Sequence, residues 1–150
     1  MNDSFILRDR KWRETNERVT LSSYAMLSEE SKGRFEKEDQ DPFRTVFERD
    51  RDRIIHSKTF RRLKHKTQVF INPDGDHFIT RMTHTLNVTQ IGRSIAKTLG
   101  LNPDLTEAIC LGHDVGHSPF GHTGEEVLND MLDGGWSHSE NSVKMLSIIE

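Results

Sequence analysis

The spacing of apolar residues along this chain predicts a mainly helical protein. The clearest stripe repeats at intervals of three and four residues and comprises Val88, Ile91, Ile95 and Leu99. We expect a helix from about Arg81 that ends at Gly100, because glycine commonly terminates helices. Asn102-Pro103 then supplies a cap and a first-turn proline for the next helix.

A more broken apolar stripe lies upstream. Asp41-Pro42 predicts the start of this helical segment, and Ser57 predicts a renewed cap within it. The apolar residues of the segment are Phe43, Val46, Phe47, Ile54, Ile55, Phe60 and Leu63. Residues 1–41 lack such a stripe, so we expect an irregular leader there, with one or two short helices. A turn signal at residues 72–75 predicts a short hairpin or loop near residues 69–79.

The C-terminal third alternates glycine-rich breaks with helices. Gly116, Pro119 and Gly121 predict a tight loop, followed by a helix over about residues 123–132. Ser137 and Glu140 have the spacing of a capping box for a last helix. The pattern predicts an all-α helical bundle, with a leader over residues 1–41 and one domain over residues 42–150.

Composition excludes several classes of protein. No apolar run approaches the roughly 18 residues that a transmembrane helix needs, and the first residues do not resemble a secretion signal. Cys110 is the single cysteine and has no partner for an intrachain disulfide. We therefore expect a cytoplasmic protein that does not associate with membranes.

Charge is unevenly distributed along the chain. Residues 44–66 contain nine basic and three acidic residues, whereas residues 67–150 contain four basic and eleven acidic residues. A basic segment beside an acidic, histidine-containing one suits a site that holds a metal cation next to an anionic substrate. Charge runs are also common on solvated helix faces, so this pattern alone does not decide the function.

Histidines carry the chemical signal. His84 opens the first clear helix, His138 lies at the last predicted cap, and residues 113–122 read HDVGHSPFGH. A lone histidine is most often a hydrogen-bonded structural residue. Five histidines and an aspartate in and around a glycine-punctuated loop instead favour a site for a divalent metal.

These segments resemble the HD superfamily, and within it the bacterial deoxynucleoside triphosphate triphosphohydrolases. The resemblance rests on HDVGHSPFGH, on RMTHTLNVTQIGRSIA (81–96) and on RDRDRIIHSKTFRRLKHKTQVF (49–70). LSSYAMLSEESKGR (21–34) and GGWSHSENS (134–142) extend it. The order of these segments is more specific than the His-Asp pair alone. The chain then corresponds to the N-terminal portion of an HD domain.

The resemblance implies the hydrolysis of dGTP or other dNTPs to deoxynucleoside and inorganic triphosphate. By position it implies that His84, His113 and Asp114 bind a divalent metal, Mg²⁺ or Mn²⁺. It likewise implies a catalytic pair and four substrate contacts. The pair is His122 and Glu125, and the contacts are Gln68, Arg81, His117 and His138. The family's assembly into homo-oligomers is a further expectation.

One departure from the family pattern concerns the metal. The family's fourth ligand is an aspartate well downstream, and nothing here matches it, because Asp130 and Asp133 lie too close to His122. We therefore expect the chain to continue beyond Glu150, and residues 1–150 alone to show little activity. Two alternatives stay open: an HD phosphodiesterase or phosphohydrolase for another nucleotide, and a non-catalytic module that binds nucleotides or single-stranded nucleic acid through residues 44–66.

Overall fold

The computed structural model describes residues 7–34, 36–66 and 79–149. The all-α prediction is confirmed, since the regular elements in these ranges are helices. Gln68 and nearly all of the predicted hairpin or loop at 69–79 lie outside the described residues.

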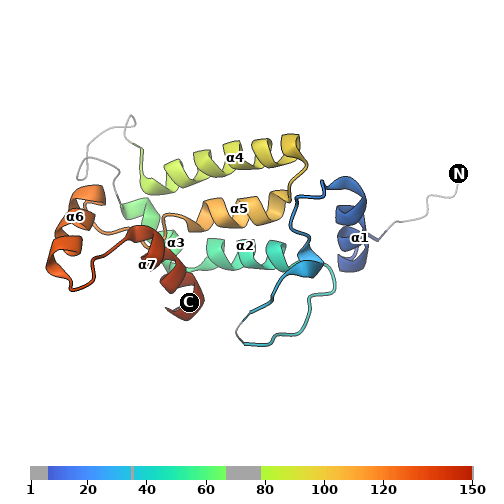
Figure 1. Cartoon of the computed structure of the whole chain (residues 1–150), viewed down its shortest axis with the longest axis horizontal. Helices are drawn as coiled ribbons and strands as arrows, with labels where there is room; N and C mark the ends of the chain where they lie inside the picture. Colours follow the sequence, from blue (N-terminus) through green and yellow to red (C-terminus); the bar gives the residue numbers. More distant parts are fainter. Residues whose placement is uncertain (1–6, 35, 67–78, 150) are drawn as a thin grey trace, which may run out of the picture.

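Three helices form the body of the molecule (Figure 1). The central helix is α5 (Pro103–Gly112), which packs against α4 (Arg81–Leu99) on one side and α2 (Val46–His56) on the other. One end carries α6 (Gly121–Met131) and α7 (His138–Lys144), and the opposite end carries α1 (Arg10–Thr20). The short elements are η1 (Ser28–Glu30), α3 (Lys58–Arg62), η2 (Leu63–His65) and the π-type turn η3 (Met145–Ile149).

The start of α2 differs from the prediction. Asp41 accepts hydrogen bonds from the backbone N–H groups of Phe43 and Arg44, both at 2.8 Å, and so caps a turn rather than a helix. The helix begins four residues after Pro42, at Val46, where Thr45 and Glu48 form a capping box. Thr45 and Glu48 are both buried, which makes this the better protected of the two possible starts.

The other predicted caps in the middle of the chain are confirmed. The Ser57 hydroxyl accepts from the Phe60 N–H at the start of α3. The Asn102 side chain accepts from the backbone N–H groups of Asp104 and Leu105. Gly100 ends α4 with φ of 69°, a conformation that glycine adopts without strain.

The apolar stripe of α4 does not form the core. Ile91, Ile95 and Leu99 are 62%, 53% and 60% exposed, whereas Thr85, Thr89 and Ala96 are buried. Small and hydroxyl side chains allow α4 to pack closely on α5. The stripe that predicted the helix therefore faces outward in this chain.

The core lies at the end of the bundle nearest α7. Phe60, Leu63, Leu111 and Val115 are its buried members. Ile54, Met82, Met145 and Leu146 pack around them. Leu111 and Val115 flank the His113-Asp114 pair, so the core directly supports the residues with chemical potential.

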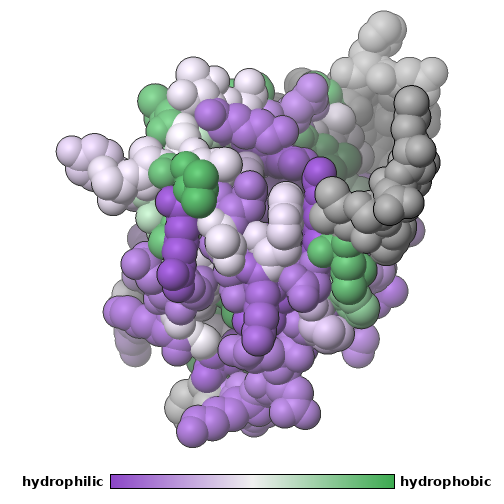
Figure 2. Space-filling view, turned by 90° about the vertical axis from the view of Figure 1, so that its right-hand side faces the viewer, coloured by the Kyte–Doolittle hydropathy of each residue, from purple (hydrophilic) through white to green (hydrophobic). Residues whose placement is uncertain are grey.

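Polar side chains cover the end of the molecule at α1. Figure 2 shows this face as largely hydrophilic, with small separate hydrophobic groups. Among the described residues, no helix combines the length and the apolar character that crossing a bilayer requires.

Candidate metal and phosphohydrolase site

Three donors from two helices meet beside the core. His84 lies in the first turn of α4, and His113 and Asp114 follow α5 directly. One ligand atom from each of these side chains lies within 4.8 Å of the others. The rings of His84 and His113 are edge to face, with centroids 5.6 Å apart. We refer to these three residues as the HD triad.

The HD triad fits a divalent cation. His113 Nδ1 lies 2.7 Å from the carbonyl oxygen of Cys110, and because a carbonyl only accepts, Nδ1 carries the proton. The lone pair of the neutral ring is then on Nε2, which is 3.7 Å from Asp114 Oδ1. A backbone carbonyl behind a ligand histidine is a common way to fix the ring for metal binding.

Arg81 holds the carboxylate of the triad. Its guanidinium donates to Asp114 Oδ2 at 2.9 Å, and both side chains are about 95% buried. Burial by itself raises the pKa of Asp114, but the electrostatic interactions with His113 and Arg81 outweigh it and hold this pKa below its ordinary value. Asp114 is therefore an anionic ligand at neutral pH. The contact that the structure gives Arg81 is with this aspartate.

A second group of donors lies on the adjoining loop and helices. It consists of His117, His122, Glu125 and His138, whose ligand atoms also lie within 4.8 Å of one another. The rings of His117 and His138 are stacked, with centroids 4.6 Å apart, and His122 is edge-on to both. We call this set the His-Glu cluster.

Glu125 is the centre of the His-Glu cluster. It accepts from His122 Nδ1 at 3.1 Å, from His138 Nδ1 at 2.9 Å and from the His138 backbone N–H at 2.9 Å. Partial burial raises the pKa of Glu125, but the hydrogen bonds from His138 and His122 lower it to about 2 overall. Glu125 therefore stays ionised and orients both rings.

His117 is the buried member of this cluster. It is 2% exposed, and burial together with the nearby charge of Arg81 lowers its pKa to about 4. Its Nδ1 faces the carbonyl oxygen of Ser118 at 3.4 Å, while its Nε2 has no hydrogen-bond partner among the described residues. The neutral ring thus keeps an unused lone pair in the interior.

Close packing of α7 on the loop brings the cluster together. A Cβ on Gly116 would come within 2.2 Å of the Ser142 nitrogen, so a glycine is required there. The Ser142 hydroxyl accepts from the Gly116 N–H at 3.0 Å and lies 2.9 Å from the carbonyl oxygen of His113. Asn141 adds a hydrogen bond to the carbonyl oxygen of Gly116 at 2.7 Å.

The two helices that carry the cluster differ in detail from the prediction. The α6 helix begins at Gly121, two residues earlier than expected, because Phe120 adopts φ of 65° and turns the chain sharply. The predicted capping box of Ser137 and Glu140 is wrong. Ser137 instead pairs with Ser139, and Glu125 of α6 accepts the His138 N–H at the start of α7.

Of the nine residues singled out from the sequence, seven therefore lie in these two adjacent groups, Arg81 contacts Asp114 of the HD triad, and Gln68 lies outside the described residues. Sequence reasoning missed Lys66 and Ser142. Lys66 Nζ donates to the carbonyl oxygen of His117 at 2.6 Å and ties the loop to η2. The only sequence signal for this contact was that Lys66 belongs to the basic segment at residues 44–66.

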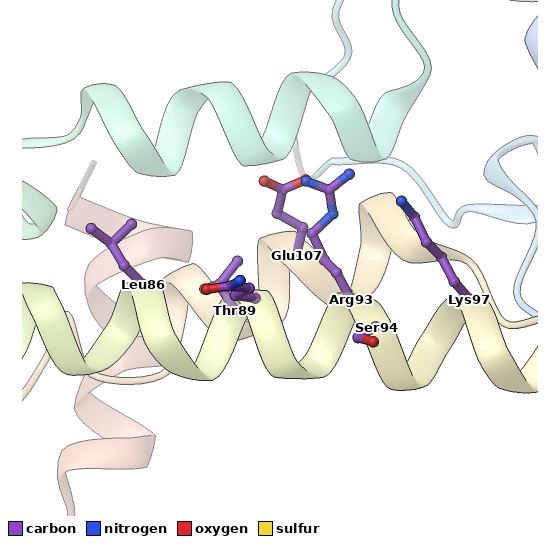
Figure 3. Close-up of a pocket in the computed structure, with 7 residues that line it drawn as sticks. Leu86, Thr89, Arg93, Ser94, Lys97 and Glu107 are labelled. Carbon is purple, nitrogen blue, oxygen red and sulfur yellow. The ribbon is translucent and has the colours of Figure 1, made fainter.

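A surface hollow of about 390 Å³ lies apart from these groups, along α4 (Figure 3). Its lining residues are Leu86, Thr89, Gln90, Arg93, Ser94, Lys97 and Glu107. Arg93 and Glu107 point toward each other across it and form an ion pair at 3.3 Å. None of the eight predicted site residues that the structure describes lines this hollow.

Comparison with known proteins connects the two groups with a family. Residues 81–150 match the family described as HD domain. The chain is 64% identical over 130 residues to the deoxyguanosinetriphosphate triphosphohydrolase-like protein of Caldanaerobacter subterraneus, an alignment of 87% of this chain and 38% of that protein. It is 59% identical over 141 residues to the protein of the same description from Clostridium tetani, covering 94% and 40%. The chain thus spans about two fifths of the length of the curated relatives that it matches.

Proposed function

We propose a function for this chain on the basis of its similarity to known proteins. Residues 81–150 match the HD domain, and the chain is similar to deoxyguanosinetriphosphate triphosphohydrolase-like proteins. The proposed reaction is the metal-dependent hydrolysis of a deoxynucleoside triphosphate, dGTP or another dNTP, to the deoxynucleoside and inorganic triphosphate. The observation that carries the proposal is the pairing of the HD triad with the adjacent His-Glu cluster.

The HD triad is the proposed metal site. Two imidazoles and one carboxylate suit Mn²⁺, and Mg²⁺ is the other candidate. A divalent cation held there would stabilise the negative charge that develops on the phosphoryl oxygens. Arg81 keeps Asp114 ionised and aimed at this position.

His122 and Glu125 are the proposed catalytic pair. The side chain of His122 is 73% exposed and therefore accessible to a substrate, while Glu125 fixes its Nδ1 proton. The lone pair of the neutral ring then lies on Nε2, where it can exchange a proton with the attacking water or the leaving 5′-oxygen. Glu125 also stabilises the imidazolium that forms when Nε2 takes up a proton.

The remaining side chains of the two groups face the triphosphate in this proposal. The rings of His117 and His138 lie beside the ring of His122, and we assign both residues to the phosphates. Arg81 and Gln68 keep their predicted roles beside the phosphates and the sugar, respectively. A cytoplasmic, homo-oligomeric enzyme is part of the same proposal.

A nucleic-acid-binding module is the less favoured alternative. Residues 44–66 are basic, but Arg44 and the arginines of α2 already form ion pairs with carboxylates. Arg51, for example, contacts Asp52 at 3.0 Å, as well as Asp104 and Glu107 of α5. These arginines support the packing of α2, which leaves less free positive charge for a phosphate backbone.

The products of hydrolysis test the proposal. A protein of the relatives' length is incubated with Mn²⁺ and each dNTP, and the products are separated by ion-exchange chromatography. Deoxynucleoside and intact triphosphate are expected, and Asp114→Asn should abolish both. Release of deoxynucleoside monophosphate would instead indicate the alternative class, another HD-type phosphohydrolase or phosphodiesterase.

A further inference from the structure

We propose that the His-Glu cluster is itself a metal site, selective for imidazole-preferring divalent transition metals such as Zn²⁺ and Co²⁺ and separate from the HD triad. It offers three imidazoles and one carboxylate from the loop, α6 and α7, with one ligand atom from each within 4.8 Å of the others. Four nitrogen and oxygen donors match the number that zinc takes in closed protein sites.

The spacing of the donors is close to that of a coordination sphere. With metal–ligand bonds of about 2.0–2.1 Å, neighbouring ligand atoms of a tetrahedral site are roughly 3.3 Å apart. Glu125 oxygens already lie 2.9 Å from His138 Nδ1 and 3.1 Å from His122 Nδ1. A cation bound to Nδ1 of both rings would require each neutral ring to carry its proton on Nε2 instead, and rotation of the exposed His122 ring would complete the closure.

His117 supplies the independent observation. Its ring is 2% exposed and stacked on His138, and its Nε2 has no partner among the described residues. A buried nitrogen of this kind is uncommon, because interior polar atoms are almost always paired. With its proton on Nδ1, facing the carbonyl oxygen of Ser118, the ring offers a lone pair on Nε2. Such a lone pair can bind a cation.

The choice of metal separates this cluster from the HD triad. Three imidazoles favour Zn²⁺, Co²⁺ and Ni²⁺, whereas Mg²⁺ prefers oxygen donors. The triad is smaller and takes part in the proposed hydrolysis, but metal binding by the cluster does not depend on that reaction. Under the proposed function, an ion in the cluster would withhold His122 and Glu125 from proton transfer.

Titration with Co²⁺ tests the inference without an activity assay. The metal-free 150-residue chain is titrated while the visible absorption of bound Co²⁺ is recorded, and the bound metal is counted by elemental analysis after gel filtration. We expect two Co²⁺ per chain, one in each group. His84→Gln should leave one, held by the cluster, and His122→Gln and His138→Gln should each weaken this second site by roughly 10-fold or more.

His56→Gln is the matched control, because His56 is exposed on α2 and belongs to neither group. It should bind two Co²⁺ with unchanged affinities. Because the side chain of His122 is exposed, His122→Gln should leave the fold intact. Co²⁺ binding by His122→Gln therefore tests the inference even if His138→Gln unfolds. A single Co²⁺ that is lost with His84→Gln, or unchanged binding in His122→Gln, would overturn the inference. Either result would leave the proposed hydrolysis untouched.

Discussion

His122 combines exposure with a fixed ring orientation. Its side chain is 73% exposed, yet its Nδ1 is held by Glu125 at 3.1 Å. Such a ring meets a substrate without having to break a buried contact first. This position suits proton transfer, and it contrasts with the buried His117 beside it.

We predict that His122→Ala lowers the rate of dNTP hydrolysis by about 10²–10⁴-fold in a protein of the relatives' length. The Mn²⁺ content of the HD triad should stay nearly unchanged, because His122 contacts no residue of the triad in the structure. Triphosphate release and elemental analysis measure the two quantities. Thr123→Ala, an exposed neighbour, serves as the control. Joint loss of Mn²⁺ and activity would make His122 a ligand of the triad metal.

Arg81 and Asp114 form the most buried ion pair of the site. Arg81→Ala leaves the carboxylate of Asp114 in the interior without its main partner, so we expect a loss of about 3 kcal/mol in the free energy of unfolding. Arg93→Ala removes a more exposed partner of Glu107 and should cost less than about 1 kcal/mol. Urea denaturation of the metal-free chain compares them, and equal losses would contradict the prediction.

His117 should make the stability of the metal-free chain depend on pH. Its pKa is about 4 in the folded chain and about 6.5 when unfolded, so between these values the unfolded chain binds a proton that the folded chain does not. This contribution to stability is complete above pH 6.5 and is lost toward pH 4, at roughly 1 kcal/mol per pH unit. Urea midpoints at pH 7 and pH 5 should therefore differ less in His117→Gln than in the unchanged chain. His56→Gln should keep the full difference, and an unaltered slope in His117→Gln would refute the assignment.

At the scale of elements, the attachment of α7 to the loop decides whether the two groups form. Ser142 hydrogen-bonds to Gly116 and lies against the carbonyl oxygens of both His113 and His138. One hydroxyl thereby links the HD triad to the His-Glu cluster. The loop and α7 are held as a single unit.

Gly116→Ala should separate α7 from the loop. The new Cβ would meet backbone atoms of α7 at 2.2 Å, which no side-chain rotation relieves. We expect a loss of stability of about 1–3 kcal/mol, with weaker Co²⁺ binding to the His-Glu cluster. Gly112→Ala is the matched control, since its Cβ would meet only side-chain ends, those of Leu146 at 2.9 Å and Ile54 at 3.6 Å. Thermal melts and Co²⁺ titration check both variants, and a fully stable Gly116→Ala chain would contradict this account.

Local signals predicted helices better than they predicted which face each helix buries. Asn102-Pro103 and Gly100 act through their own backbone neighbours, so these boundaries could be predicted from the sequence. The start of α2 could not, because Asp41 and Thr45 are both good caps, and burial of Thr45 and Glu48 favours the second. The apolar stripe of α4 predicted the helix but not its buried side. Periodicity shows that apolar residues share one face of a helix, but it does not show which element, if any, packs against that face.

In the candidate site, too, local sequence signals could be predicted, whereas contacts between elements could not. The histidines and the His113-Asp114 pair indicated the site, and the family resemblance added Glu125 and Arg81; seven of these residues lie in the two groups, and Arg81 contacts Asp114. The partner of Arg81 and the cap of α7 by Glu125 both depend on contacts between elements. Ser142 could not be found from spacing, because its role arises only where α7 touches Gly116.

At the scale of the whole molecule, the chain presents apolar surface on several helices. Ile91 and Ile95 of α4, Ile109 of α5, and Val127 and Met131 of α6 are each more than half exposed. The relatives are about two and a half times as long as the aligned region. Among the described residues, the buried hydrophobic cluster consists of Phe60, Leu63, Leu111 and Val115.

Metal affinity and activity should both depend on residues beyond the three donors of the HD triad. Within the described ranges, His84, His113 and Asp114 form a group of three with no further carboxylate. Three ligands orient a metal less firmly than four, and a poorly held metal does not maintain the near-attack geometry that supplies much of the rate. We therefore predict that residues 1–150 bind Mn²⁺ at the triad roughly 10-fold or more weakly than a protein of the relatives' length, with little or no dNTP hydrolysis.

Parallel measurements on the two lengths check this prediction. Mn²⁺ binding is followed by the loss of free Mn²⁺ signal in electron paramagnetic resonance, and triphosphate release is followed with each dNTP. Open coordination positions are normal at catalytic metals, so three ligands and a water are a real alternative. Turnover by residues 1–150 at roughly 1 s⁻¹ or above, the range of ordinary enzymes, would favour this alternative. Weak Mn²⁺ binding that Asp114→Asn abolishes, without turnover, would instead show that the triad is formed and that further ligands are needed for catalysis.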